Sequence, residues 1–247
     1  MSKYTYNKDY FSKIDTAEKA YWLGFLYADG CITRFYKGDE LRSMSLEITL
    51  QSQDKEHLEK FKDSLNANVP IQDRTIAGKY KANRLVINNT KLCNDLIKLG
   101  CTPQKSLTLT FPTEEQLKNE YISHFIRGYF DGDGCVSYTE HNVFHKRKNK
   151  NYDQYSYVCS FTGNKNFITS IKDVLENNGI KVSPVYKSKS KAVDIYIKGF
   201  DNIENFKKYI YKNDSMSLSR KKDKFFFIAT NEELLINKRK QDRFSPD

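Results

Sequence analysis

The sequence has no long apolar run. No stretch approaches the ~20 consecutive apolar residues that a membrane-spanning helix needs, so we expect no membrane partner. Residues 1–15 are polar and lack the apolar core of a secretory signal peptide. These absences predict a protein that is not secreted and that acts in the cytoplasm, associated with the nucleoid, or in an organelle.

Cysteines are few and are not paired along the sequence. There are five, an odd number, with no Cys-x-x-Cys spacing, which suits free thiols in a reducing compartment. His141 and His145 could on paper bind zinc with Cys135 and Cys159, but the spacing is not that of a standard zinc site. The sequence also lacks a glycine-rich phosphate loop, a Ser-His-Asp set and a dinucleotide-binding fingerprint.

Positive charge, by contrast, is in excess. Lys plus Arg number 41 against 31 Asp plus Glu, which gives a formal net charge of +10. A surplus of this size favours a polyanionic partner, either a nucleic acid or an acidic membrane. A soluble basic protein without such a partner would show the same surplus, so charge alone leaves that alternative open.

A short motif occurs twice in the chain. Residues 21–31 read YWLGFLYADGC, and residues 125–135, at an offset of 104, read FIRGYFDGDGC. Further on, residues 61–65 match residues 171–175 at an offset of 110. The sequence therefore predicts two similar halves about a pseudo-two-fold axis, with about six extra residues in the second half within 139–154.

Hydrophobic periodicity predicts the order α-β-β-α-β-β-α in each half, with Asp15 and Glu18 capping the first helix and Thr113 and Gln116 capping its counterpart. The expected halves are residues 1–102 and 113–247, the second with a basic tail, joined by a linker over 103–112. The expected helices are 15–30, 54–66, 90–99, 113–134, 165–178, 201–211 and 220–238. The expected strands are 31–37, 44–51, a hairpin over 69–88, 135–143, 155–162, 182–187 and 192–198.

Each motif helix is apolar or aromatic nearly all round, which predicts that it is buried. Gly24 and Ala28 are four residues apart, as are Gly128 and Gly132. Small residues at this spacing form a smooth face that lets two helix backbones approach closely. We therefore expect the two motif helices to pack against each other, with Gly24 and Gly128 at their interface.

Asp29 and Asp133 fall at the C-termini of the motif helices, where the helix dipole disfavours a carboxylate by a few tenths to ~1 kcal/mol. If the helices pack side by side, the two carboxylates converge. Paired carboxylates favour a hard divalent cation such as Mg²⁺, which can activate water to attack a phosphodiester. A simple Asp-Gly turn after a helix is the alternative, and its repetition in the same context argues against it.

The two motifs, WLGFLYADG at 22–30 and IRGYFDGDG at 126–134, resemble the LAGLIDADG motif of homing endonucleases. The resemblance covers nearly the whole chain. It implies an α+β fold with the motif helices at the interface and antiparallel sheets that form a saddle in the DNA major groove. It also implies that the final acid of each motif binds metal, aided by the preceding carbonyl, here from Ala28 and Gly132. Tyr27 departs from the motif, whereas Asp131 keeps it; neither is the implied metal ligand.

The resemblance also places a lysine near each scissile phosphate, after the third helix of each half. Lys105 and Lys221 fit these positions, with Arg220 beside the second, although a linker lysine without a role is the alternative. Lys187, Lys189 and Lys191 alternate along an extended segment and should form one row that contacts phosphates, unless they are simply a solvated face. Further expected DNA contacts are Lys79, Lys81 and Arg84, with Gln51, Gln53 and Asn164 as candidates for orienting water or contacting DNA.

These features lead to one principal hypothesis and two alternatives. The principal one is a monomeric, site-specific homing endonuclease, intron-encoded or freestanding, that hydrolyses both strands of a long pseudo-palindromic double-stranded DNA. It would depend on Mg²⁺, and Mn²⁺ or Ca²⁺ could replace Mg²⁺ for binding. The alternatives are a maturase that binds its host intron RNA and a DNA-binding regulator without cleavage. Retention of Asp29 and Asp133 argues against the regulator only.

Overall fold

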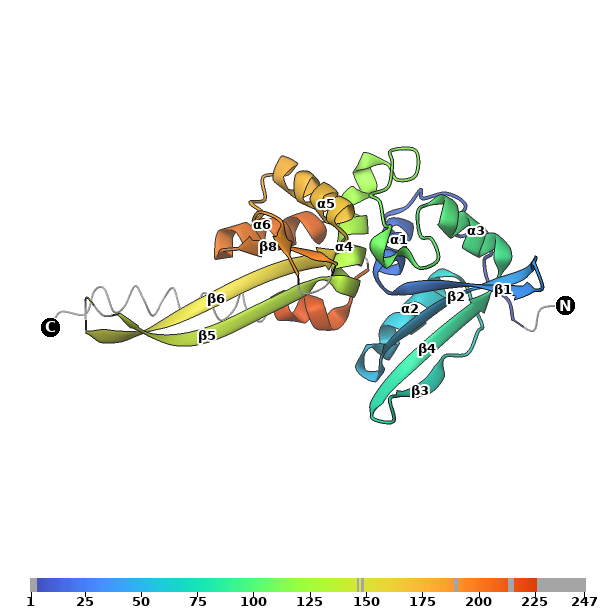
Figure 1. The fold of residues 1–247 in the computed structure, drawn as a ribbon, viewed down its shortest axis with the longest axis horizontal. Helices are drawn as coiled ribbons and strands as arrows, with labels where there is room; N and C mark the ends of the chain where they lie inside the picture. Colours follow the sequence, from blue (N-terminus) through green and yellow to red (C-terminus); the bar gives the residue numbers. More distant parts are fainter. Residues whose placement is uncertain (1–3, 146, 148, 189–190, 213–215, 226–247) are drawn as a thin grey trace.

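The computed structural model describes residues 4–145, 147, 149–188, 191–212 and 216–225. Figure 1 shows two helices, α1 and α4, at the centre of the molecule, with one four-stranded sheet and its covering helices on each side. No helix among these residues is long and apolar enough to cross a membrane. The architecture confirms the predicted α+β fold with two similar halves and the motif helices at their interface.

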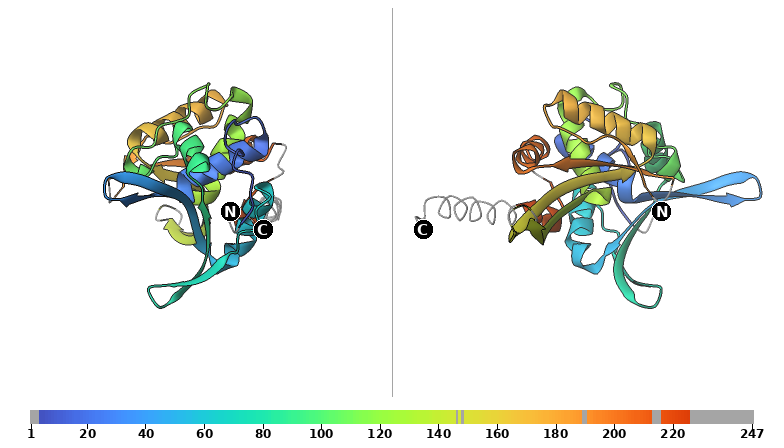
Figure 2. Two further views of the ribbon diagram at one scale, coloured as in Figure 1. Left: turned by 90° about the vertical axis from the view of Figure 1, so that its right-hand side faces the viewer. Right: turned by 60° about the vertical axis from the view of Figure 1, so that its left-hand side comes forward.

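The first half contains an antiparallel sheet with the strand order β1-β2-β4-β3. Its elements are α1 (Ala17–Asp29), β1 (Gly30–Lys37), β2 (Glu40–Gln51), η1 (Ser52–Asp54), α2 (Lys55–Ser64), β3 (Gln72–Ile76), β4 (Tyr80–Asn88) and α3 (Thr90–Lys98). In Figure 2 the β1–β2 hairpin (blue) and the β3–β4 hairpin (teal) curve away from the helices in different directions.

The second half repeats this arrangement with the strand order β5-β6-β8-β7. Two short 3₁₀ turns, η2 (Lys105–Leu107) and η3 (Asn119–Tyr121), precede it. Its elements are α4 (Ile122–Asp133), β5 (Cys135–His145), β6 (Lys150–Gly163), α5 (Lys165–Asn177), β7 (Tyr186–Lys187), β8 (Val193–Lys198) and α6 (Phe200–Ile210). Residues 219–225 are helical, and the rest of the predicted helix over 220–238 lies outside the described residues.

The extra residues of the second half lengthen a hairpin. β5 and β6 pair without interruption from Cys135 opposite Ser160 to His145 opposite Lys150, whereas the β1–β2 ladder ends at Lys37 opposite Glu40. β5 includes His141 and His145 and runs two residues beyond the predicted end of this strand at 143. The insertion therefore extends one arm of the second sheet, as Figure 1 shows.

The first motif helix starts near the predicted position but has a different capping residue, and the second starts later than predicted. Thr16 is the N-cap of α1 and accepts from Lys19 N at 3.2 Å, while Asp15 pairs with the Lys19 ammonium at 2.8 Å. α4 begins at Ile122 rather than near Thr113. The turn at Thr113 ends early because the Gln116 amide donates to Lys98 O at 2.7 Å, which ties this segment to the end of α3.

The central helices meet backbone to backbone. A methyl group built at Gly24 would lie 2.0 Å from Phe125 O, and one at Gly128 would lie 1.9 Å from Tyr21 O. Neither clash involves a side chain that could rotate away. Around this crossing the aromatic side chains of both helices are fully buried, including Trp22 and Phe130. The small residues of the motif therefore set the distance between the two halves.

Substitution of either glycine at the crossing should destabilise the protein. Gly24→Ala and Gly128→Ala should lower the free energy of unfolding by about 1–3 kcal/mol or more, and Gly128→Val should lower it further, because overpacking must push two backbones apart. Thermal melting measures the effect. The matched control is Ser170→Ala on α5, whose hydroxyl donates to Asn166 O of its own helix, and which should melt close to the parent. Glycine variants that melt at or above the parent temperature would contradict the close crossing.

Candidate functional site at the ends of the paired helices

Two carboxylates lie at the adjoining ends of the central helices. Asp29 is the last residue of α1, and Asp133 is the last residue of α4. A methyl group built at Gly132 would lie 2.2 Å from Ala28 Cβ and 3.1 Å from Asp29 Oδ2, so the two helices still touch at this end. Asp29 is half-buried and Asp133 is exposed. The structure thus brings together the acids of the two motifs, as the sequence predicted for parallel packed helices.

The environment of these acids disfavours negative charge. Burial, and after it the charge of Asp133, raises the pKa of Asp29 to about 6, although Lys221 and Lys105 act in the opposite direction. Although Asp133 is exposed, loss of hydration beside the helix ends also raises the pKa of its carboxyl, again against the two lysines. Both shifts agree with carboxylates placed at the negative ends of two helix dipoles.

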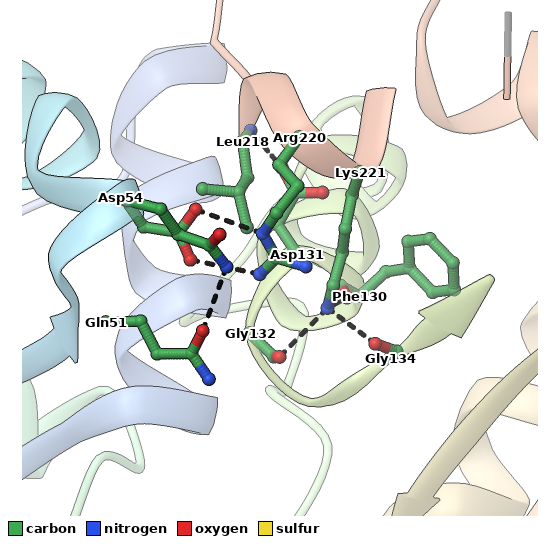
Figure 3. A network of polar contacts seen from close by, with 10 residues as sticks. Gln51, Asp54, Phe130, Asp131, Gly132, Gly134, Leu218, Arg220 and Lys221 are labelled. Atoms are coloured by element: carbon green, nitrogen blue, oxygen red, sulfur yellow. Dashed lines mark hydrogen bonds and ion pairs between the residues drawn. The ribbon is translucent and has the colours of Figure 1, made fainter. Parts of the chain in front are cut away.

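Two buried lysines lie at the same helix ends. Lys105 is 8% exposed and its ammonium donates to Gly30 O, just beyond α1. Lys221 is 6% exposed and donates to Phe130 O at 2.7 Å, to Gly132 O at 2.9 Å and to Gly134 O, at the end of α4 (Figure 3). Each ammonium therefore donates to backbone carbonyl groups at or just beyond the end of a central helix. A linker lysine without a role would not be buried in this way.

The charges at the site add up to a negative value, which favours a bound cation. Two carboxylates and two helix C-termini of about half a negative charge each outweigh two ammonium groups by about one negative charge. The oxygen donors at hand are the carboxylates of Asp29 and Asp133 and the carbonyl groups of Ala28 and Gly132. Among the described residues no group of three or more His, Cys, Asp or Glu side chains could hold a metal. A pair of carboxylates fits Mg²⁺, which keeps several of its waters, better than ions that need a complete cage of protein ligands.

The comparisons with known proteins agree with this geometry. Residues 120–211 match the model of the LAGLIDADG-like domain. The match covers most of the second half of the chain and does not extend over the first half. The matched region begins just before α4 and contains the second motif, and the structure shows the first motif in the equivalent place on α1. No curated protein matches the sequence significantly.

Solved LAGLIDADG structures share the fold over nearly the whole chain. The meganuclease I-AabMI bound to uncleaved DNA is 15% identical, with 88% of this chain and 92% of that chain covered and a TM-score of 0.58. The homing endonuclease I-LtrWI bound to target DNA is 13% identical, with 93% and 92% covered and a TM-score of 0.60. I-SmaMI bound to an uncleaved DNA target in the presence of calcium ions is 13% identical, with 92% and 93% covered and a TM-score of 0.59. At these identities the likeness shows the fold.

The structure places the predicted basic residues that it describes on or beside the strands of the two sheets. Lys79 and Lys81 are exposed at the β3–β4 hairpin, whereas Arg84 on β4 is paired with Glu47 of β2, which partly neutralises its charge. Lys187 and Lys191 are exposed too, and Lys189 lies outside the described residues. The predicted single row is wrong, because the chain turns between Lys187 and Lys191, where Ser188 N donates to Ala192 O at 3.1 Å.

The predicted polar contacts divide into two groups. Gln51 and Gln53 are exposed and are joined by a hydrogen bond of 2.9 Å. Asn164 is buried and is the N-cap of α5, where it accepts from Phe167 N at 3.0 Å and donates to Leu109 O at 2.7 Å. The Asn164 amide is therefore engaged inside the protein, at the start of α5 and at Leu109.

Sequence reasoning missed an ion pair beside the site. Arg220 donates to both carboxylate oxygens of Asp54, at 3.1 and 3.0 Å, and so joins the segment that carries Lys221 to the first half (Figure 3). Asp54 is buried and precedes Asn164 by the repeat offset of 110. That equivalence was the available signal, since both residues stand where a sheet strand passes into the following helix.

The site can be tested without any substrate through its pH dependence. Because the pKa of Asp29 is raised to about 6, the folded protein binds more protons than the unfolded chain between about pH 4 and 6, and Asp29 lowers stability increasingly as the pH rises through that window. In EDTA, Asp29→Asn should therefore melt above the parent at pH 7.5, and this advantage should shrink toward pH 4.

Addition of Mg²⁺ should make the parent, rather than Asp29→Asn, the protein with the higher melting temperature at pH 7.5. Mg²⁺ bound only by the native state should raise the melting temperature of the parent at pH 7.5 and leave that of Asp29→Asn unchanged. Scanning calorimetry with EDTA or with Mg²⁺ measures both effects. A variant that melts below the parent in EDTA at pH 7.5, or that gains as much from Mg²⁺ as the parent does, would contradict the assignment.

Proposed function

We propose that this protein is a site-specific endonuclease that hydrolyses both strands of a long double-stranded DNA target. The observation that carries the proposal is the convergence of Asp29 and Asp133 at the adjoining ends of α1 and α4, beside two buried ammonium groups. Solved proteins of the same fold support it, since they are described as homing endonucleases bound to target DNA or to cleaved DNA.

The residues at the helix ends suit metal-assisted hydrolysis of a phosphodiester. Asp29 and Asp133, with the carbonyls of Ala28 and Gly132, would hold Mg²⁺, which when bound supplies an activated water and charge neutralisation. A solved structure of the same fold is described as bound to an uncleaved DNA target in the presence of calcium ions, which agrees with a divalent cation in this fold. The two aspartates would also orient the attacking water.

Lys105 and Lys221 would each serve one DNA strand. Lys105 donates to a carbonyl just beyond the end of α1, and Lys221 donates to a carbonyl near the end of α4. An ammonium fixed by carbonyl acceptors has its position set before substrate arrives, so it can stabilise negative charge as it develops on the phosphate. This arrangement needs only one chain, and we infer that the active species is a monomer acting on two related half-sites.

The two curved sheets would supply the contacts that select the target. Exposed lysines on the hairpins, among them Lys79, Lys81 and Lys187, would bind phosphates and give salt-dependent affinity. Lys191 and Asp133 line one open cavity of about 450 Å³, so this lysine would lie near the reacting phosphate. Side chains along the strands would read base edges in the major groove. A regulator without cleavage would need these surfaces but not the paired acids.

The direct test is a selection of cleaved sequences from a randomised duplex library. The parent should yield one family of related targets in Mg²⁺ and none in EDTA. On the selected duplex, Asp29→Asn and Asp133→Asn should each abolish double-strand cleavage, because either substitution removes one of the two carboxylates that hold the metal and orient the water.

Binding separates this outcome from a general loss of structure. Both variants should bind the selected duplex in Ca²⁺ about as tightly as the parent, as measured by fluorescence anisotropy. Full cleavage by either variant would overturn the role of the acid pair. A selection that returns no enriched sequence in Mg²⁺ would overturn the proposed function itself.

A further inference from the structure

The residues two places before Asp29 and Asp133 contact the chain segments that carry Lys105 and Lys221. Tyr27 and Asp131 are equivalent at the repeat offset of 104, and both side chains are buried. The Tyr27 hydroxyl donates to Leu99 O at 2.6 Å, at the start of the segment that leads to Lys105. The carboxylate of Asp131 accepts from Leu218 N at 2.7 Å, three residues before Lys221. Neither group is directed at the metal-binding acids, and each is directed at a lysine-bearing segment of its own half.

Each lysine-bearing segment has a second contact, which comes from a residue of the other half. Asn164 of the second half donates to Leu109 O at 2.7 Å, and Leu109 N donates to Lys105 O at 3.0 Å. Asp54 of the first half binds Arg220, the residue beside Lys221, through both carboxylate oxygens. Each lysine is therefore held between one contact from its own half and one from the other half.

The two holding arrangements differ in chemistry although they occupy equivalent places. On the Lys221 side, Asp131 also accepts from the Tyr21 hydroxyl at 2.7 Å, and Tyr21 lies 3.0 Å from His57 Nε2, so the contacts are polar and partly charged. On the Lys105 side, the ring of Tyr27 packs edge-on against Phe125 at 5.0 Å, and Phe125 is the repeat equivalent of Tyr21. One side thus depends on a buried carboxylate and the other on a single hydroxyl among aromatic rings.

We propose that Asp131 and Tyr27 are positioning residues that place Lys221 and Lys105 respectively, so that each of them controls cleavage of a different DNA strand. The inference rests on the proposed endonuclease function. The lysine ammoniums reach their carbonyl acceptors only when the preceding segments are fixed, because Leu218 lies one helical turn before Lys221 and its O accepts from Lys221 N at 3.0 Å. Loss of one holding contact displaces one lysine and leaves the other in place.

The test uses the duplex selected with the parent, with a different fluorophore at the 5′ end of each strand. Tyr27→Phe removes only the hydroxyl that holds Leu99 O, and Asp131→Leu removes the acceptor of Leu218 N. Each variant should cut one strand about tenfold or more slowly than the parent, since a misplacement of ~1 Å can cost ~100-fold in rate. The slowly cut strand should differ between the two variants. Each variant should therefore accumulate duplex that is nicked only in the strand that it still cuts at the parental rate.

Conservative variants show whether the effect comes from the holding contacts. Asp131→Asn keeps an oxygen that can accept from Leu218 N and should recover part of the rate that Asp131→Leu loses. Asp54→Asn weakens the hold on Arg220 and should slow the same strand as Asp131→Leu. It also tests the Lys221 side if Asp131→Leu does not fold, which thermal melting reports.

The possible results separate this inference from the proposed function. A parent that cuts neither strand removes the proposed function. A parent that cuts both, with variants that slow both strands equally or slow the same strand, overturns the positioning role, because a general weakening of the fold has no strand preference. Variants that cut both strands at the parental rate overturn it as well.

Discussion

The close crossing of α1 and α4 is the constraint on which the rest of the structure depends. Gly24 and Gly128 bring the two backbones so near that a methyl group would meet a carbonyl oxygen of the other helix at 2.0 and 1.9 Å. This contact fixes the two halves relative to each other and makes both helices end at the same place. The acids, the lysines and the two sheets all take their positions from that junction.

The junction also concentrates charge. Two helix C-termini and two carboxylates meet in one partly buried region, and burial, followed by the charge of Asp133, raises the pKa of Asp29. Lys105 and Lys221 offset part of it by donating to the helix-end carbonyls, and each of them is fixed in turn by a chain segment from beyond its own helix. The functional groups are thus held by contacts that are structural in their own right, as a pre-organised site requires.

Much of this arrangement could be predicted from the duplicated motif. The glycine spacing indicated a close helix pair, and Asp29 and Asp133 at equivalent helix ends indicated a shared site. The start of α4 and the role of Asn164 could not be predicted, because they depend on hydrogen bonds to Lys98 O and Leu109 O, far along the chain. Alternation suggested one row of lysines at 187–191, but it could not show that the chain turns there.

The central claim is that one chain supplies both acids of a single composite site. Mixing Asp29→Asn and Asp133→Asn in equal amounts tests it most directly, with double-strand cleavage of the selected duplex as the measurement. If the site forms between α1 and α4 of the same chain, every molecule in the mixture lacks one acid, and the account predicts no recovery of cleavage. Restored double-strand cleavage in the mixture would show that sites assemble from two chains, and would contradict the account.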